Sequence, residues 1–260
     1  MTAINPEELL LAYRLGIFPM AESRAAPEVL WVRPHERGIL PLDKFHVPKR
    51  LARVVRSNRF KITADEAFEA VIRACAESQP DRRETWINDA IIDVFVSLHA
   101  RGFAHSIETW HEGKLVGGLY GLSLGGAFFA ESKFSRATDA SKVALVHLAA
   151  RLKAGGYTLL DAQFPNPHLE QFGAITVTEE RFQFMLAQAL SRSGDFYGLG
   201  RGAAATGAGT AEGAGAARGT PGGSVAAGAG PAATGGAAVS GTAPAPAAGS
   251  SVLQVIAHTS

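Results

Sequence analysis

The spacing of apolar side chains changes after about residue 100, and the change marks a switch in secondary structure. Beyond this point apolar and polar residues alternate, which is typical of β-strands. Three strands are therefore predicted, at 105–110, 115–120 and 127–132. The pairs Glu112-Gly113 and Gly125-Gly126 are the candidate turns between them.

Helical spacing dominates on both sides of these strands. Residues 6–15 suit a short helix, which the turn before Pro19 ends. Thr63 to Glu66 has the spacing of a capping box and is expected to begin a helix that carries Cys75 on its apolar face. The other predicted helices begin after Pro48 and span about 88–100, 139–154 and 178–190, and short strands are expected at 30–34, 38–42, 159–163 and near Ile175.

The order of these elements predicts the fold class. Helices precede three antiparallel strands, and a long helix then leads to a further strand, which indicates an α+β fold whose sheet changes from antiparallel to parallel pairing. The acetyltransferase (GNAT) superfamily has the same order, an analogy of pattern alone. We expect a small N-terminal α/β domain over 1–62 and an acetyltransferase-like domain with a mixed sheet over 63–198.

The composition of the 260-residue chain changes at about Gly200. Up to there it is that of a globular protein, whereas 199–250 is almost entirely Gly, Ala, Thr, Pro and Ser and is expected to be disordered. The last segment, 251–260, regains alternation around Val252 and Ile256. This segment is expected to form either an edge strand of the sheet or a frayed terminus.

Charge and targeting signals narrow the class of protein further. The formal net charge is +1, so any nucleic-acid contact must come from a local patch. Glu7 and Glu8 stand where a signal peptide carries positive charge, and no stretch reaches transmembrane length. The single cysteine, Cys75, cannot form an intramolecular disulfide. A cytoplasmic protein that makes no membrane contact is expected.

Polar residues at the ends of two apolar strands are the candidates for an active site. Asp161 and Gln163 lie two apart in a predicted strand, so their side chains are expected on the same face. Glu131 follows the apolar run 128–130 and joins them if the two strands adjoin. For Glu131 alone, a structural carboxylate bonded to backbone N–H groups or to Arg136 is the alternative.

The loop before the predicted 139–154 helix bears on the class of acyl donor. An acetyltransferase that uses coenzyme A has a glycine-containing loop there, whose backbone N–H groups bind the pyrophosphate. Residues 135–142 contain no glycine. Coenzyme A is therefore not expected as the donor, and no bound cofactor is expected.

Motifs spread over roughly residues 6–190 resemble those of the bacterial leucyl/phenylalanyl-tRNA–protein transferases. They are Tyr13-Arg-Leu-Gly-Ile-Phe-Pro19, Leu30-Trp31 to Pro34, Thr85-Trp86-Ile87, Ala104-His105-Ser106-Ile-Glu108, Leu115-Val-Gly-Gly-Leu-Tyr-Gly121, Glu131-Ser-Lys-Phe-Ser-Arg136, Ala140-Ser-Lys142 and Leu160-Asp161-Ala-Gln163. Because they occur in the family's order, the match is specific.

The resemblance implies an enzyme that moves Leu or Phe, with Met as a further candidate, from its tRNA to the N-terminal Arg or Lys of a protein. The product is an N-terminal degradation signal. Roles in the reaction and in acceptor recognition are implied for Asp161, Gln163 and Glu131. The residues implied near the aminoacyl and adenosine pocket are Trp86, Leu119, Phe128, Leu148 and Leu152, together with Met20.

The chain departs from the family pattern in three places. Met20 stands where better-known members have a Trp. Met makes looser contacts with an aromatic ring than Trp does, so the donor's terminal adenosine is expected to stack less firmly here. Ala162 replaces a common Cys between Asp161 and Gln163. The Gly/Ala-rich stretch has no assigned role in the family.

An ester-linked donor requires little base catalysis, because an α-amine has a pKa near 8. We expect the Gln163 side-chain oxygen to accept a hydrogen bond from the attacking amine, with Asp161 orienting Gln163 and relaying the proton. Glu131 is expected to attract the cationic acceptor side chain.

Helical spacing also predicts a basic stripe on the helix after Pro48, which suits contact with tRNA phosphates. A solvated helix face without a partner is the alternative. The stripe consists of Lys49, Arg50, Arg53 and Arg56.

The residues are also compatible with two other functions. One is an acyltransferase of the same fold with another donor, and the other is a tRNA-binding module without catalysis.

The spacing of His99, His105 and His111 places no two on one helical face, so no metal site is expected. A monomer is the default expectation.

Overall fold

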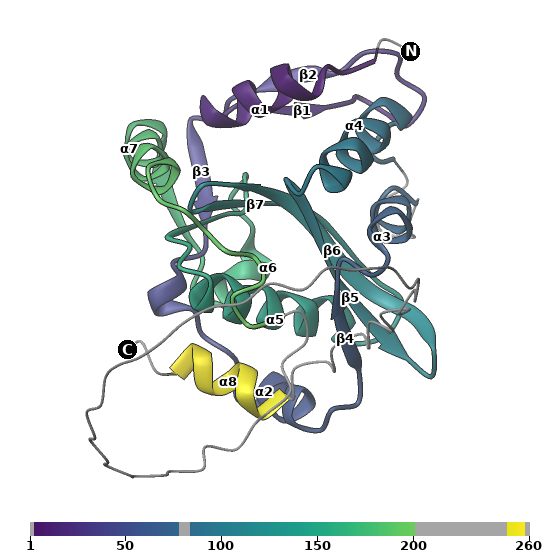
Figure 1. The fold of residues 1–260 in the computed structure, drawn as a ribbon, viewed down its shortest axis with the longest axis vertical. Coiled ribbons are helices and arrows are strands. Elements are labelled where there is room, and N and C mark those ends of the chain that lie inside the picture. The colour runs from purple at the N-terminus through teal and green to yellow at the C-terminus, as the bar shows by residue number, and fades with distance from the viewer. Residues whose placement is uncertain (1–2, 78–83, 201–248, 258–260) are drawn as a thin grey trace, which may run out of the picture.

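The computed structural model describes residues 3–77, 84–200 and 249–257. A seven-stranded mixed sheet forms the centre of the fold, with the strand order β4-β5-β6-β7-β8-β3-β9 (Figure 1). All neighbouring strands pair antiparallel except β7 and β8, which are parallel. The predicted α+β class and the predicted change from antiparallel to parallel pairing are confirmed.

The element bounds follow the predicted periodicity closely in the middle of the chain. The strands are β1 (Phe18–Met20), β2 (Leu30–Val32), β3 (Glu36–Ile39), β4 (Lys61–Ala64), β5 (Ala104–His111), β6 (Lys114–Leu124), β7 (Ala127–Ser135), β8 (Leu159–Asp161) and β9 (Ile175–Thr178). The helices are α1 (Pro6–Arg14), α2 (Lys49–Arg56), α3 (Phe68–Cys75), α4 (Asp89–Ala100), α5 (Ala140–Ala154), α6 (Pro167–Glu170), α7 (Glu179–Leu190) and α8 (Gly249–Ala257), with a short 3-10 turn at Leu42–Lys44.

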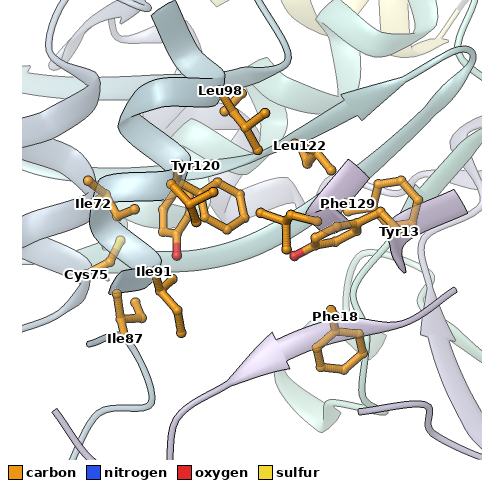
Figure 2. Packing of buried hydrophobic residues seen from close by; sticks show 14 of the residues in the cluster. Tyr13, Phe18, Ile72, Cys75, Ile87, Ile91, Leu98, Tyr120, Leu122 and Phe129 are labelled. Carbon is orange, nitrogen blue, oxygen red and sulfur yellow. The ribbon is translucent and has the colours of Figure 1, made fainter. Parts of the chain in front are cut away.

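The two faces of the sheet are covered by different helices. Side chains from α1, α3, α4 and α7 form one hydrophobic cluster, and side chains from α2, α5 and α8 form the other. Figure 2 shows part of the first cluster, where Tyr13 packs against Phe129 with ring centroids 5.0 Å apart. Cys75 is buried in the same cluster, as predicted.

The first part of the chain contributes to two sheets. Strands β1 and β2 pair only with each other, while β3 pairs antiparallel with β8 and β9 in the main sheet. The segment 1–62 therefore contains a strand of the central sheet as well as the small β1–β2 hairpin. This pairing brings β3 beside Asp161, at the Ile39–Asp161 register position.

The prediction of a capping box at Thr63 to Glu66 is wrong. Thr63 lies inside strand β4, and its hydroxyl donates to the buried Glu108 carboxylate on the neighbouring strand. Helix α3 begins at Phe68, with Ala67 as an N-cap that offers no side-chain acceptor. A hydrogen bond to a distant strand has replaced the local bond that the spacing predicted.

Residues Gly249–Ala257 form helix α8, so the edge strand, one of the two alternatives left open for 251–260, is wrong. In α8, Val252 and Ile256 are buried against α2 and α5, while Lys153 on α5 donates to the carbonyl of Ile256 at 2.7 Å. A spacing of four residues fits one face of a helix as well as one face of a strand, so the pattern could not separate the two. The Gly/Ala-rich residues 201–248 lie outside the described residues.

Candidate functional site

Three predicted site residues meet at the junction of β7 and β8. Asp161 is the last residue of β8, Gln163 follows two residues later, and Glu131 lies on β7, the parallel neighbour. The Gln163 amide nitrogen donates to Glu131 Oε2 at 2.8 Å. The side chains of Gln163 and Glu131 are therefore in contact, while Gln163 lies beyond the end of β8 and does not share a strand face with Asp161.

Gln163 reaches this position through a turn and not through continuation of the strand. Its φ is 65°, which lies in the left-handed region that non-glycine residues seldom adopt. Its backbone N–H donates to Asp161 Oδ1 at 2.8 Å, which is a bond of the Asx-turn type. The Asp161 side chain therefore holds the Gln163 backbone, and its orienting role in the reaction stays a prediction.

Glu131 stands at a β-bulge. Ala130 pairs with Gly121 and Ser132 pairs with Tyr120, so Glu131 is the extra residue on β7. Bulges turn a side chain away from the regular alternation and are frequent next to active sites. Here the bulge turns the carboxylate toward Gln163 and toward Tyr13 on α1.

Burial gives Glu131 unusual acid–base behaviour. The residue is only 7% exposed, and desolvation raises the pKa of its carboxyl to about 8, although Tyr13 and Gln163 act in the opposite direction. Within the described residues, its Oε1 atom makes no well-formed hydrogen bond. The Glu131 carboxyl thus has one clear hydrogen-bond partner in Gln163 and a second neighbour in the Tyr13 hydroxyl.

Arg37 belongs to this site and was missed in the sequence. It lies on β3, is 1% exposed, and donates to both carboxylate oxygens of Asp161, from Nε at 2.9 Å and from Nη2 at 2.6 Å. Its Nη1 atom donates to the carbonyl of Gly16 at 2.9 Å. A buried carboxylate without a cation is strongly unfavourable, so Arg37 is what allows Asp161 to lie fully buried.

The residues predicted for the aminoacyl and adenosine pocket divide between the two clusters. Met20 and Trp86 are partly buried and pack against the cluster that contains Tyr13. The other four lie in the cluster on the α5 face, with exposures between 0% and 3%: Leu119, Phe128, Leu148 and Leu152. Their assignment to a pocket stays a prediction, and in this structure they are packed core residues.

A small cavity of about 100 Å³ adjoins the loop that carries Gln163. Gly38, Ala162 and Phe164 are among its lining residues. Drug-sized ligands occupy sites of roughly 300–1,000 Å³, so this cavity is too small to hold both an aminoacyl group and an adenosine.

The predicted basic stripe is present on the surface of α2. Lys49, Arg50, Arg53 and Arg56 are all exposed, while Leu51 and Val55 are buried on the opposite side of the helix. Arg50 also pairs with Asp139, the residue before α5, at 2.6 Å. The stripe is a continuous cationic face of the kind that contacts phosphates, and a tRNA contact there stays a prediction.

Metal and membrane signatures can be assessed over the described residues. There, no three His, Cys, Asp or Glu side chains are grouped closely enough to hold a metal ion. The histidines noted above serve other contacts: His105 Nδ1 lies 2.8 Å from Asp65, and His99 Nδ1 lies 2.8 Å from the carbonyl of Ala104. None of the helices in this part of the chain is long and apolar enough to cross a membrane.

Solved structures with a similar arrangement are distant in sequence. FemX matches with a TM-score of 0.43 and 10% identity over 66% of each chain. L-PGS from Bacillus licheniformis matches with a TM-score of 0.36 and 15% identity, over 62% of this chain and 51% of that one. At such scores the similarity carries no information on function.

Sequence relatives and family models are far more specific. Relatives named leucyl/phenylalanyl-tRNA–protein transferase are 56% identical over 200 residues in Hyphomonas neptunium, covering 77% of this chain and 78% of that protein. Another, in Paramagnetospirillum magneticum, is 57% identical over 196 residues, covering 75% of this chain and 94% of that protein. The family model of the leucyl/phenylalanyl-tRNA protein transferases matches residues 39–187, and the model of their N-terminal domain matches residues 2–35. On these matches, which include the whole of the Glu131–Asp161–Gln163 site, the chain belongs to the leucyl/phenylalanyl-tRNA–protein transferase family.

Proposed function

We propose that the chain transfers Leu or Phe from aminoacyl-tRNA to the N-terminal Arg or Lys of acceptor proteins, in the cytoplasm and as a monomer. The tRNA-dependent transferase activity is that of the family. The identity of the acceptor and the roles of the site residues are our proposal. The observation that supports it is the buried hydrogen bond between Gln163 and Glu131, beside a Glu131 Oε1 atom that makes no well-formed hydrogen bond although Tyr13 interacts with the carboxyl.

The reaction forms one bond and breaks one. The acceptor's α-amine nitrogen attacks the aminoacyl carbonyl carbon, the ester bond to the tRNA ribose oxygen breaks, and that oxygen gains the proton which the amine loses. Because the ester is already activated, positioning the amine accounts for most of the task. The reference pKa of an α-amine is about 8, so a large part of it is neutral at cellular pH.

Gln163 is suited to hold the amine. Its amide nitrogen is engaged by Glu131 Oε2, which directs the amide oxygen away from Glu131. That oxygen can accept a hydrogen bond from the amine and orient its lone pair toward the carbonyl. The nitrogen and oxygen of the amide are assigned here from this hydrogen bond.

Glu131 is suited to recognise the cationic acceptor. Its buried Oε1 atom makes no well-formed hydrogen bond, and an arriving Arg or Lys side chain supplies both a donor and a compensating charge. Because burial raises its pKa to about 8, cation binding is coupled to loss of a proton from Glu131. A neutral acceptor gains nothing from this coupling, because Glu131 stays largely protonated and forms no ion pair with it.

The proposed role of Asp161 is narrower than expected. Its two oxygens accept bonds from Arg37 and from the Gln163 backbone, and in the described residues no hydrogen bond joins its side chain to that of Gln163. We therefore keep the orienting role and omit the proton relay.

The variants Gln163→Ala and Asp161→Asn test these roles. Asp161→Asn is preferred to Asp161→Ala, because both variants remove the counter-charge of Arg37 but Asn keeps a side-chain oxygen that can accept from it. We expect both to reduce transfer of labelled Leu to an Arg-initiated peptide far more than they reduce tRNA binding. Gln188→Ala, at an exposed position on α7, is the matched control. Equal losses of transfer and tRNA binding contradict the assignment.

A further inference from the structure

Arg37 has no assigned role, yet each part of its guanidinium is engaged. Nε and Nη2 donate to the two oxygens of Asp161 at 2.9 and 2.6 Å, and Nη1 donates to the carbonyl of Gly16 at 2.9 Å. The side chain is among the largest that are fully buried in the described residues. Burying a guanidinium costs free energy, so such complete pairing indicates a position that tolerates little change.

The faces of the guanidinium are covered by two aromatic rings. The Arg37 Cζ atom lies 4.8 Å from the Phe18 ring centroid and 4.3 Å from that of Phe182. Phe18 belongs to the β1–β2 hairpin and Phe182 to α7. Arg37 therefore contacts the N-terminal hairpin, α7 and β8 at once, and its planar group is fixed in both orientation and position.

Asp161 links Arg37 to Gln163 through a shared oxygen atom. The same Oδ1 atom that accepts from Arg37 Nε also accepts from the backbone N–H of Gln163. A left-handed backbone is unfavourable for a non-glycine residue and persists only where its surroundings hold it. Without a fixed carboxylate, Gln163 loses the bond that opposes this cost.

The backbone around Arg37 reinforces the same turn. The next residue, Gly38, donates to the Gln163 carbonyl at 3.1 Å and accepts from the Ala162 N–H at 2.9 Å. A Cβ atom on Gly38 would lie 2.4 Å from the Phe164 carbonyl oxygen, so only glycine permits this approach. Gly38 of strand β3 is thus hydrogen-bonded to both residues that follow Asp161.

We infer that Arg37 is a positioning residue for transfer: by fixing the Asp161 carboxylate, it holds Gln163 in the left-handed turn that presents the Gln163 amide to Glu131 and to the attacking amine. This inference rests on the proposed function. It adds a residue from β3 that touches neither the acceptor nor the aminoacyl ester. It also explains why the N-terminal hairpin lies against the site, since Gly16 and Phe18 help to fix Arg37.

The variant Arg37→Lys tests the inference. Lysine keeps the charge beside Asp161 but lacks the two-pronged donor geometry, so Asp161 keeps a counter-charge and loses its fixed orientation. We expect kcat for Leu transfer to fall by about tenfold or more, because small errors of position are costly in a reaction governed by orientation. KM for Leu-tRNA is expected to stay within about twofold, since Arg37 is a fully buried residue of β3 and offers no surface to the tRNA.

Arg33→Lys is the matched control. Arg33 lies four residues earlier, is exposed, and also donates to a carbonyl of the α1–β1 turn, that of Leu15 at 3.3 Å. We expect it to leave kcat unchanged. A similar fall in both variants would show that the turn, and not the Asp161 contact, is responsible.

A double-mutant cycle separates positioning from a general loss of stability. If Arg37 acts through Gln163, Arg37→Lys lowers kcat strongly in the wild-type background and by less than about twofold when Gln163→Ala is already present. An equal fold-loss in both backgrounds, or no loss in the wild-type background, overturns the inference. The thermal midpoint, measured alongside, is expected to fall by a similar amount in both backgrounds.

Guanidinium rescue supplies a second readout. We expect millimolar guanidinium to restore part of the kcat of Arg37→Ala, with methylammonium at the same concentration restoring less. Equal rescue by both ions, or rescue by neither, contradicts a need for the two-pronged geometry. Failure of the wild-type protein to transfer Leu would instead refute the proposed function and is read separately.

Discussion

Replacing Glu131 with Gln is expected to stabilise the protein while removing its activity. In the folded protein, burial raises the pKa of the Glu131 carboxyl from 4.5 to about 8. Below pH 4.5 the carboxyl is protonated in both folded and unfolded chains and has no effect on stability. As pH rises from 4.5 toward 8, the unfolded chain ionises first, so the free energy of unfolding falls throughout that window.

The size of this effect follows from the pKa difference. In the unfolded chain, pH 7 lies about 2.5 units above the pKa of this carboxyl. This difference corresponds to a loss of roughly 3 kcal/mol in the free energy of unfolding. Gln has a similar shape and cannot ionise, so Glu131→Gln should recover up to about this amount at pH 7 and almost nothing at pH 4.5. In this variant the new amide oxygen can still accept from Gln163, and the new amide nitrogen can donate toward Tyr13.

Urea unfolding at pH 5 and pH 7.5 measures the effect, with equal m-values as the condition for comparing midpoints. Glu170→Gln, at an exposed position on α6, is the control for loss of a carboxylate. A stability difference between Glu131→Gln and wild type that stays constant over this range would refute the account of Glu131 as a buried carboxyl with a raised pKa. So would a destabilised variant at pH 7.5.

Three further predictions concern acceptor binding, tRNA binding and the core. The affinity for an Arg-initiated peptide, measured by calorimetry, should rise roughly tenfold between pH 6.5 and 8 as Glu131 ionises, and Glu131→Gln should remove this part of the pH dependence. Arg53→Ala with Arg56→Ala should raise KM for Leu-tRNA and reduce the slope of log affinity against log salt by about 2, whereas an unchanged slope excludes this face from phosphate contact. Gly249→Ala should lower the thermal midpoint, because its Cβ would lie 2.0 Å from the Val55 carbonyl oxygen in the α8–α2 contact, and the exposed Ser250→Ala should not.

Much of the fold could be predicted because it is encoded locally. The alternation in β5, β6 and β7 and the helical spacing in α4, α5 and α7 each occur within one segment, and the elements formed where these patterns predicted them. Two local patterns were ambiguous or overridden. Thr63 bonds across to Glu108 instead of capping α3, and the spacing of Val252 and Ile256 fits both a strand and the helix that is present.

The candidate site could be predicted only in part. Sequence alternation predicted Asp161 and Gln163 on one face of a strand, but the strand ends at Asp161 and Gln163 lies in a left-handed turn whose backbone N–H bonds to Asp161. Arg37 pairs with Asp161 across 124 residues, a contact that no local pattern indicates. The bulge that turns Glu131 depends on the register between β6 and β7, which exists only once the sheet has formed.

The most direct test of the account is transfer of labelled Leu from charged tRNA to a peptide beginning with Arg, beside the same peptide beginning with Ala. The account predicts transfer to the Arg peptide alone, and loss of that transfer in Gln163→Ala with tRNA binding retained. Equal transfer to both peptides would contradict the role of Glu131 in acceptor choice. Binding of tRNA without transfer to either peptide would contradict the assignment of this site as catalytic.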